Sequence, residues 1–179
     1  MCIVLILALQ MPNAQASLIV SKSPVQPYAA ELKEDVSPND CMSLMRWPTD
    51  SHEVLRAFDA PPQPWLSGHR GIDLRTEPGT SLKAPRSGVI SFSGKVAGKD
   101  VVTITHTNGW KSTFEPAVTD IPRGTHIHRG SVFAHVSDGA SDHCLHECVH
   151  WGIKIAPDHY ADPALIAQLR RVTILHPQD

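Results

Sequence analysis

Short stretches in which apolar and polar side chains alternate constrain the fold of this chain more than any other feature. Such stretches occur at residues 88–94, 131–136 and 150–155, and glycine, proline or polar turn residues bound them. A period of two is typical of β-strands that bury one face. Fifteen prolines and eleven glycines also suit frequent turns better than a helical bundle. The sequence therefore predicts a mainly β protein.

A further pair of apolar runs predicts a β-hairpin. Residues 101–106 and 110–114 flank Asn108-Gly109, a dipeptide favoured in two-residue type I′ turns. Only the C-terminal segment predicts a helix, because Asp162 can cap it and Pro163 suits its first position. We therefore expect an antiparallel β-sheet or flattened barrel with a short C-terminal helix.

The first 42 residues differ from the rest of the chain. Residues 1–16 contain an apolar run that ends in Ala-Gln-Ala, which is typical of a signal peptide and its cleavage site. The basic segment that usually opens a signal peptide is missing, and a buried strand is the alternative interpretation. The run is shorter than the roughly 20 apolar residues of a membrane span. Residues 17–42 are polar and aperiodic and predict a linker, so we expect residues 43–179 to form the domain.

These features predict a secreted or cell-envelope protein whose mature chain has no transmembrane segment. The formal net charge is −2, from 16 basic and 18 acidic residues that are evenly mixed along the chain. No basic stripe is visible, so the sequence offers no electrostatic support for a nucleic-acid partner.

Two of the eleven histidines and one aspartate suggest a metal site. His69 and Asp73 form a His-x-x-x-Asp motif, and His150 opens a late strand. A hydrolytic zinc ion is typically held by three imidazole or carboxylate ligands, with a fourth position open to water. The spacing alone is a weak signal, because two polar residues on a surface turn produce the same pattern.

The surrounding residues resemble the LytM/lysostaphin-type zinc metallopeptidases. That family has a motif of the form Gly-x-His-x-Gly-x-Asp, a Gly-Thr pair, an alanine before a Gly-Val strand, and a closing His-x-His motif. The corresponding residues here include His69, Gly71, Asp73, Gly79, Thr80, Ala84, Gly88, Val89, His106, Asn108, Gly109 and His150, and Gly68 lies directly before His69. The resemblance covers about residues 65–155. It implies a fold of the duplicated-hybrid-motif type, with His69, Asp73 and His150 as zinc ligands and His106 as a structural histidine.

The chain departs from the family where two histidines would assist the activation of water. Pro116 stands where the family's aromatic-x-His motif ends, and Cys148 replaces the first histidine of His-x-His. Glu115 and His146 are the candidates to replace them as general base. Under the two-residue turn, Glu115 would face Val102 and share a sheet face with His106, away from the metal. A bulge at Pro116 could reverse this orientation.

Cys148 has three interpretations. A disulfide with Cys144 fits an exported protein and the short spacing. A fourth zinc ligand would close the site, and a cysteine nucleophile is the third alternative. Because Cys148 lies two residues before His150, both side chains should point to the same sheet face.

The resemblance implies a zinc-dependent endopeptidase that cleaves peptide bonds in bacterial peptidoglycan, with peptidoglycan peptides as its partners. The alternative is a catalytically impaired domain that binds the cell wall or a partner hydrolase as a regulator. The two differ in whether zinc binding is accompanied by cleavage.

Overall fold

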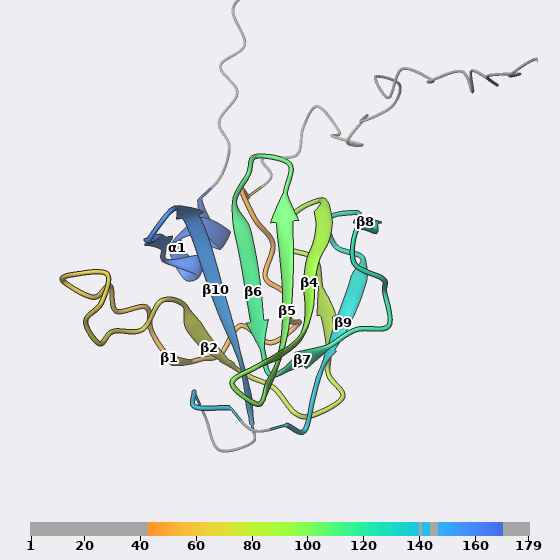
Figure 1. Ribbon diagram of the computed structural model, residues 1–179, viewed down its shortest axis with the longest axis horizontal. Helices are drawn as coiled ribbons and strands as arrows, with labels where there is room; N and C mark the ends of the chain where they lie inside the picture. The colour runs from red at the N-terminus through yellow and green to blue at the C-terminus, as the bar shows by residue number, and fades with distance from the viewer. Residues whose placement is uncertain (1–42, 140, 144–146, 170–179) are drawn as a thin grey trace, which may run out of the picture. The chain divides into compact units, whose positions relative to one another are not determined.

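The computed structural model describes residues 43–139, 141–143 and 147–169 (Figure 1). Among these residues it has eleven strands and one short helix. The strands are β1 (Val54–Arg56), β2 (Ile72–Arg75), β3 (Ser81–Lys83), β4 (Gly88–Val96), β5 (Lys99–His106), β6 (Lys111–Glu115), β7 (Ala117–Val118), β8 (His126–Ile127), β9 (Val132–Val136), β10 (Cys148–Ala156) and β11 (His159–Ala161). The predicted mainly β character is confirmed.

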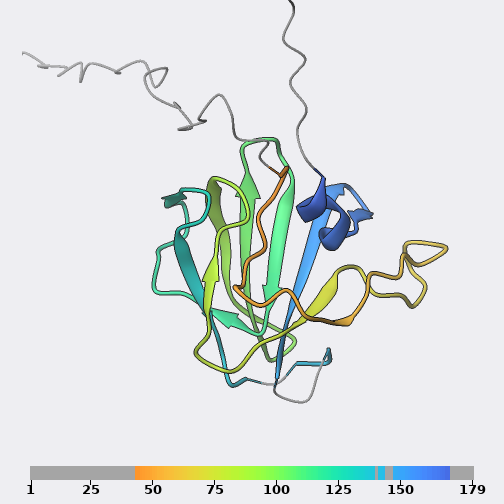
Figure 2. The same ribbon diagram turned by 180° about the vertical axis from the view of Figure 1, so that it is seen from behind.

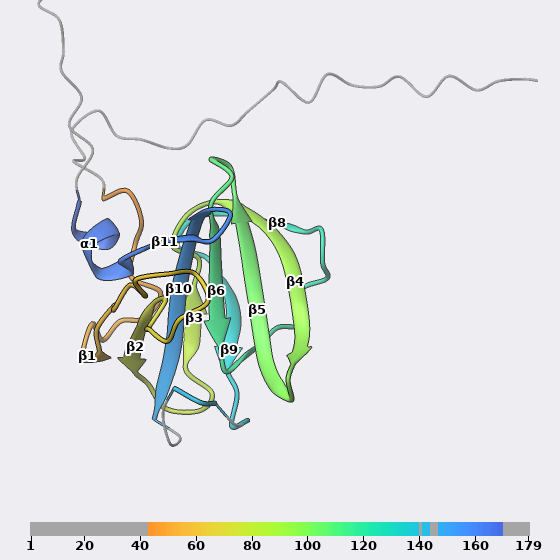
Figure 3. The same cartoon turned by 60° about the vertical axis from the view of Figure 1, so that its left-hand side comes forward.

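Two antiparallel sheets make up the domain. The larger has the order β1-β2-β10-β6-β5-β4-β8, and β11 pairs with β10 outside this path. The smaller has the order β3-β9-β7 and lies against one face of the larger sheet (Figure 3). The sheets do not close into a barrel, so the open antiparallel alternative of the predicted fold is the correct one.

The core lies between the two sheets. Phe114 and Trp151 extend from the larger sheet and meet Phe133 of the smaller one, with the Phe114 and Phe133 ring centroids 5.0 Å apart. All three aromatic side chains are almost completely buried. The segment of residues 43–50 crosses the back of the domain and buries Met45 in the same core (Figure 2). Because one face of the larger sheet is covered in this way, its other face is free to carry a functional site.

The hairpin of β5 and β6 has a different register from the predicted one. Phe114 lies opposite Val102, and Thr113 lies opposite Thr103. The strands are joined by a three-residue loop whose Gly109 has a φ of 85°, rather than by a two-residue turn. A change of one residue in register exchanges the two faces of a strand. Glu115 therefore lies on the open face, opposite to the face that was predicted for it.

The predicted C-terminal helix is present as α1 (Pro163–Gln168). The side chain of Asp162 accepts a hydrogen bond from the Ala164 amide at 2.9 Å, as expected for an N-cap. Among the described residues this is the one helix, and its six residues are far too few to span a bilayer. The predicted signal peptide at 1–16 and linker at 17–42 lie outside the described residues.

Candidate metal centre

Three of the predicted site residues meet on the open face of the larger sheet. Asp73 of β2 lies directly opposite His150 of β10 in the strand register. His69 precedes β2 and is held in place by two backbone hydrogen bonds with Asp59. All three side chains are buried, so the protein has removed a carboxylate and two imidazoles from water. Such a set is costly to bury unless its members bind one another or a metal ion.

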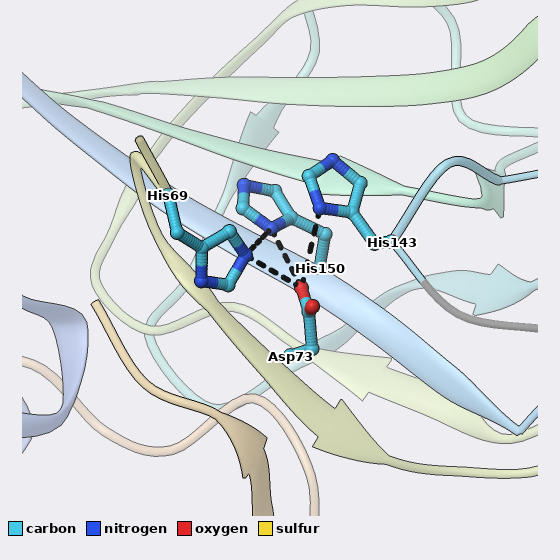
Figure 4. Close-up of side chains that lie close together, drawn as sticks. All are labelled: His69, Asp73, His143 and His150. Carbon is cyan, nitrogen blue, oxygen red and sulfur yellow. Dashed lines mark hydrogen bonds and ion pairs between the residues drawn. The ribbon is translucent and has the colours of Figure 1, made fainter. Parts of the chain in front are cut away.

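The ligating atoms of these residues converge (Figure 4). Asp73 Oδ1 lies 3.0 Å from His69 Nε2 and 2.9 Å from His150 Nδ1, and the two nitrogens are 3.1 Å apart. Three atoms at these separations can all lie at roughly 2.0–2.2 Å from a single ion, which is the bond length of zinc to imidazole and carboxylate. The residues therefore fit a zinc ion.

The tautomer of His69 also suits a metal ligand. Its Nδ1–H donates to the Ala57 carbonyl at 2.7 Å, so its Nε2 carries the lone pair that faces the cluster. Asp73 Oδ2 is buried without a hydrogen-bond partner. Burial alone would raise the pKa of Asp73, but the hydrogen bond from His150 and the charge of that ring outweigh it and lower the pKa. An ionised, partly unsatisfied carboxylate is a ligand suited to a cation.

Gly71 and Gly152 allow the His150 ring to lie in the cluster. A Cβ atom added to Gly71 would be 2.7 Å from His150 Nε2, and one added to Gly152 would be 3.3 Å from the same atom. A side chain at Gly71 would thus clash with this imidazole and with the Trp151 carbonyl of the neighbouring strand, so the ring or the backbone would have to move. This close approach gives a physical reason for the glycine between His69 and Asp73.

A fourth residue, His143, completes the cluster, and no pattern in the sequence indicated it. Its ring stacks on that of His150 with centroids 3.8 Å apart, and its Nδ1 lies 3.5 Å from Asp73 Oδ1. That Nδ1 atom is buried and has no hydrogen-bond partner. Burial, followed by the charge of His150, lowers the pKa of His143 to about 4. His143 precedes β10 in a loop, where no strand period or motif spacing indicates its direction.

Among the described residues, the ligating atoms of His69, Asp73, His143 and His150 all lie within 4.8 Å of one another, and Cys148 is not part of this set. Cys148 is buried at the start of β10, opposite Arg75. Cys144 and the candidate base His146 lie outside the described residues, so the disulfide and the role of His146 remain predictions.

Glu115 lies beside the cluster rather than on the far face. It is directly opposite His150 in the register of β6 and β10. Its carboxylate lies 3.4 Å from Lys99 Nζ, accepts a hydrogen bond from Ser141 at 3.3 Å, and is 3.9 Å from His143 Nε2. Lys99 also contacts Asp142, the neighbour of His143, at 2.5 Å. Glu115 and Lys99 thus hold the segment that carries His143.

A groove of about 340 Å³ opens next to the cluster. His143, His150 and Glu115 line one end of it, and its remaining lining residues are Gly68, Arg70, Lys111, Thr113, Gly152, Lys154 and Tyr160.

His106, in contrast to the residues of the cluster, lies in the core, where it hydrogen-bonds to the Arg86 carbonyl and to Ser112 Oγ. These contacts agree with the prediction that His106 is a structural histidine.

Comparisons with known proteins give a consistent result. Residues 67–163 match the model of "Peptidase family M23". An uncharacterized protein of Mycobacterium tuberculosis (strain H37Rv) is 33% identical over 125 residues, which cover 68% of this chain and 50% of the relative. The chain thus spans about half the length of the curated relatives it matches.

Two solved structures share the fold. A zinc-containing peptidase from Vibrio cholerae has a TM-score of 0.55 at 17% identity, covering 66% of this chain and 38% of that one. The catalytic domain of the antimicrobial peptidase lysostaphin from Staphylococcus simulans has a TM-score of 0.55 at 15% identity, covering 65% of this chain and 92% of that one.

Proposed function

Because the chain belongs to peptidase family M23, we propose that it is a zinc-dependent endopeptidase that hydrolyses peptide bonds in bacterial peptidoglycan. Family membership confirms the resemblance found in the sequence. The observation that carries the proposal is the convergence of His69 Nε2, Asp73 Oδ1 and His150 Nδ1 at one end of an open groove. The solved zinc-containing peptidase and lysostaphin, which share the fold, support the choice of metal and of reaction.

His69, Asp73 and His150 would hold the zinc ion. When bound, zinc supplies a Lewis acid that polarises the scissile carbonyl and makes the attacking water more acidic. The groove beside these residues lies along the open face of β6 and β10. An extended peptide could lie along it with one amide bond next to the cluster.

Among the described residues, His143 is the best placed general base. Its Nδ1 faces the cluster without a hydrogen-bond partner, so it can accept a proton from the attacking water. The water oxygen would bond to the carbonyl carbon, the C–N bond would break, and the proton would pass from His143 to the leaving amine. His143 would in this way replace an assisting histidine that the family carries where Pro116 and Cys148 stand here.

Glu115 is better suited to positioning His143 than to acting as a base. Its carboxylate is engaged by Lys99 and Ser141, and it faces the opposite ring nitrogen of His143. A carboxylate in this place favours a proton on Nε2 and leaves the lone pair on Nδ1. The arrangement resembles a base oriented by a third group, although the 3.9 Å separation is longer than a hydrogen bond.

Such an enzyme would act outside the cytoplasm, where its substrate lies. We accordingly propose that residues 1–16 direct export and that residues 17–42 link them to the peptidase domain.

The alternative function is that of a domain that binds the wall or a partner hydrolase without cutting. It is suggested by Pro116 and Cys148 at the positions of the assisting histidines.

Zinc analysis combined with a wall-digestion assay tests the proposal. The purified protein should contain one zinc ion per chain and release soluble fragments from purified peptidoglycan. His69→Ala should remove both properties, whereas the exposed His128→Ala should change neither. If the wild-type protein binds zinc but releases no more fragments than His69→Ala, the regulatory alternative is correct.

His143→Gln separates a base from a ligand. Loss of a general base typically slows a reaction by about 10²–10⁴-fold, so this variant should retain zinc while its kcat falls by such a factor. A loss of zinc affinity together with activity would instead make His143 a fourth ligand of a closed site. An unchanged kcat would exclude both roles.

A further inference from the structure

The floor of the groove is a ladder of paired residues from β6 and β10. His150 lies opposite Glu115 at the metal end, Gly152 lies opposite Thr113 in the middle, and Lys154 lies opposite Lys111 at the far end. The small side chains in the middle leave room for a substrate backbone. From His150 to Lys154 the strand advances by about 13 Å, at roughly 3.3 Å per residue.

The far end of the groove gathers positive charge. Lys111 and Lys154 occupy directly opposed positions on neighbouring strands, an arrangement in which like charges repel. Arg70 lines the same groove, and both its Cζ and Lys154 Nζ lie beside the ring of Tyr160, at 5.9 Å and 5.5 Å from the centroid. Three cations thus converge in a chain whose formal net charge is −2.

These cations are only weakly neutralised by the protein. Glu115 is the acidic residue that lines the groove, and it is engaged by Lys99 at the metal end. The exposed Asp158 lies 3.6 Å from Lys154. Within the described part of the chain, no carboxylate forms an ion pair with Arg70 or Lys111.

Arg70 is also fixed in position before any ligand arrives. Its Nη2 donates to the carbonyls of Pro64 and Leu66 at 2.6 Å and 3.0 Å, and it follows the proposed ligand His69 directly in sequence. A guanidinium that is held in this way loses little conformational entropy when it binds an anion. The repulsion between the lysines would likewise be relieved by a bound negative charge.

We propose that this end of the groove is a subsite for a carboxylate group of the substrate. The inference deepens the proposed function, on which it rests: the preferred wall peptide carries a free carboxylate about three or four residues from the scissile amide, given the ~3.3 Å rise of an extended chain. Peptides that are neutral over this stretch would bind more weakly. The residues that determine this preference are Arg70, Lys111 and Lys154.

Chemical neutralisation of the wall tests the proposal. Purified peptidoglycan is divided, and in one half the carboxyl groups are converted to amides with a carbodiimide and ammonia. Co-sedimentation with each insoluble wall gives the affinity, and release of soluble fragments gives KM and kcat. We compare the wild-type protein, Lys111→Met, Lys154→Met and the double variant. Lys95→Met is the matched control, because Lys95 is exposed and lies outside the groove.

The wild-type protein should bind the native wall more tightly than the amidated wall, and added salt should reduce the difference. Each lysine variant should weaken binding to the native wall by about two- to fivefold, the range of a partly exposed ion pair. The loss should appear in KM rather than kcat, and Lys111→Arg should restore binding. On the amidated wall the variants should match the wild type.

Equal affinity of the wild-type protein for the two walls, or lysine variants that bind like Lys95→Met, would overturn the subsite. Because binding is measured separately from cleavage, this outcome is distinct from failure of the proposed function. A protein that discriminates between the walls but cuts neither would retain the subsite and lose the peptidase activity.

Discussion

Protonation of His106 should destabilise the fold in mild acid. This histidine is almost completely buried, and burial lowers its pKa from 6.5 to about 4. Its ring bonds the Arg86 carbonyl and Ser112 Oγ, so it is held neutral in the core. Between these two pKa values the folded state binds fewer protons than the unfolded state. The contribution of the neutral ring to the free energy of unfolding is therefore fully present above pH 6.5 and is lost as the pH falls toward 4.

The magnitude follows from the shift. A difference of about 2.5 pKa units corresponds to about 3 kcal/mol when the titration is complete, and to about 2 kcal/mol at pH 5. The assay is urea unfolding at pH 7.5 and pH 5 for the wild-type protein and for His106→Gln. Because both proteins share the histidines of the His/Asp cluster, the difference between their pH dependences isolates His106. Between pH 7.5 and pH 5, the free energy of unfolding should fall by about 2 kcal/mol less in the variant than in the wild type.

The exposed His128→Gln serves as the control and should keep the pH dependence of the wild type. If His106→Gln folds poorly, NMR titration of the wild-type imidazole provides a second measurement, and the His106 ring should stay neutral down to about pH 4–5. The reasoning is refuted if His106→Gln loses as much stability as the wild type, or if the ring titrates near pH 6.5.

Three further predictions concern the site. Gly71→Ala should lower the free energy of unfolding by about 1–3 kcal/mol and weaken zinc binding, because the new methyl group would meet the His150 ring; unchanged zinc affinity by competition with a chelator would contradict this. Lys99→Met should reduce kcat while leaving the zinc content intact, because Lys99 holds Glu115 and the segment of His143; a kcat equal to that of Lys95→Met would argue against such positioning. Protein prepared under oxidising conditions should expose no titratable thiol from Cys144 or Cys148, and two free thiols would exclude their disulfide.

The sequence by itself predicted five of the eleven strands and the capped helix, and its resemblance to a known family implied three members of the His/Asp cluster. The predictions of secondary structure rest on local chemistry. Alternation of apolar residues reflects a sheet with one buried face, and Asp162-Pro163 is a helix start that neighbouring residues alone define. His69, Asp73 and Gly71 belong to one short motif, where the glycine makes room for an imidazole that comes from another strand.

The tertiary structure decided the remaining parts of the site. The face of Glu115 depends on the hairpin register, and a loop of three residues in place of two moved it next to His150. His143 comes from a loop, where side-chain direction has no period, and it faces the cluster because Lys99 and Glu115 contact its neighbourhood from distant strands. Pairing of strands within the larger sheet sets both features, and the contacts of Glu115 and Lys99 exist only once these strands have paired.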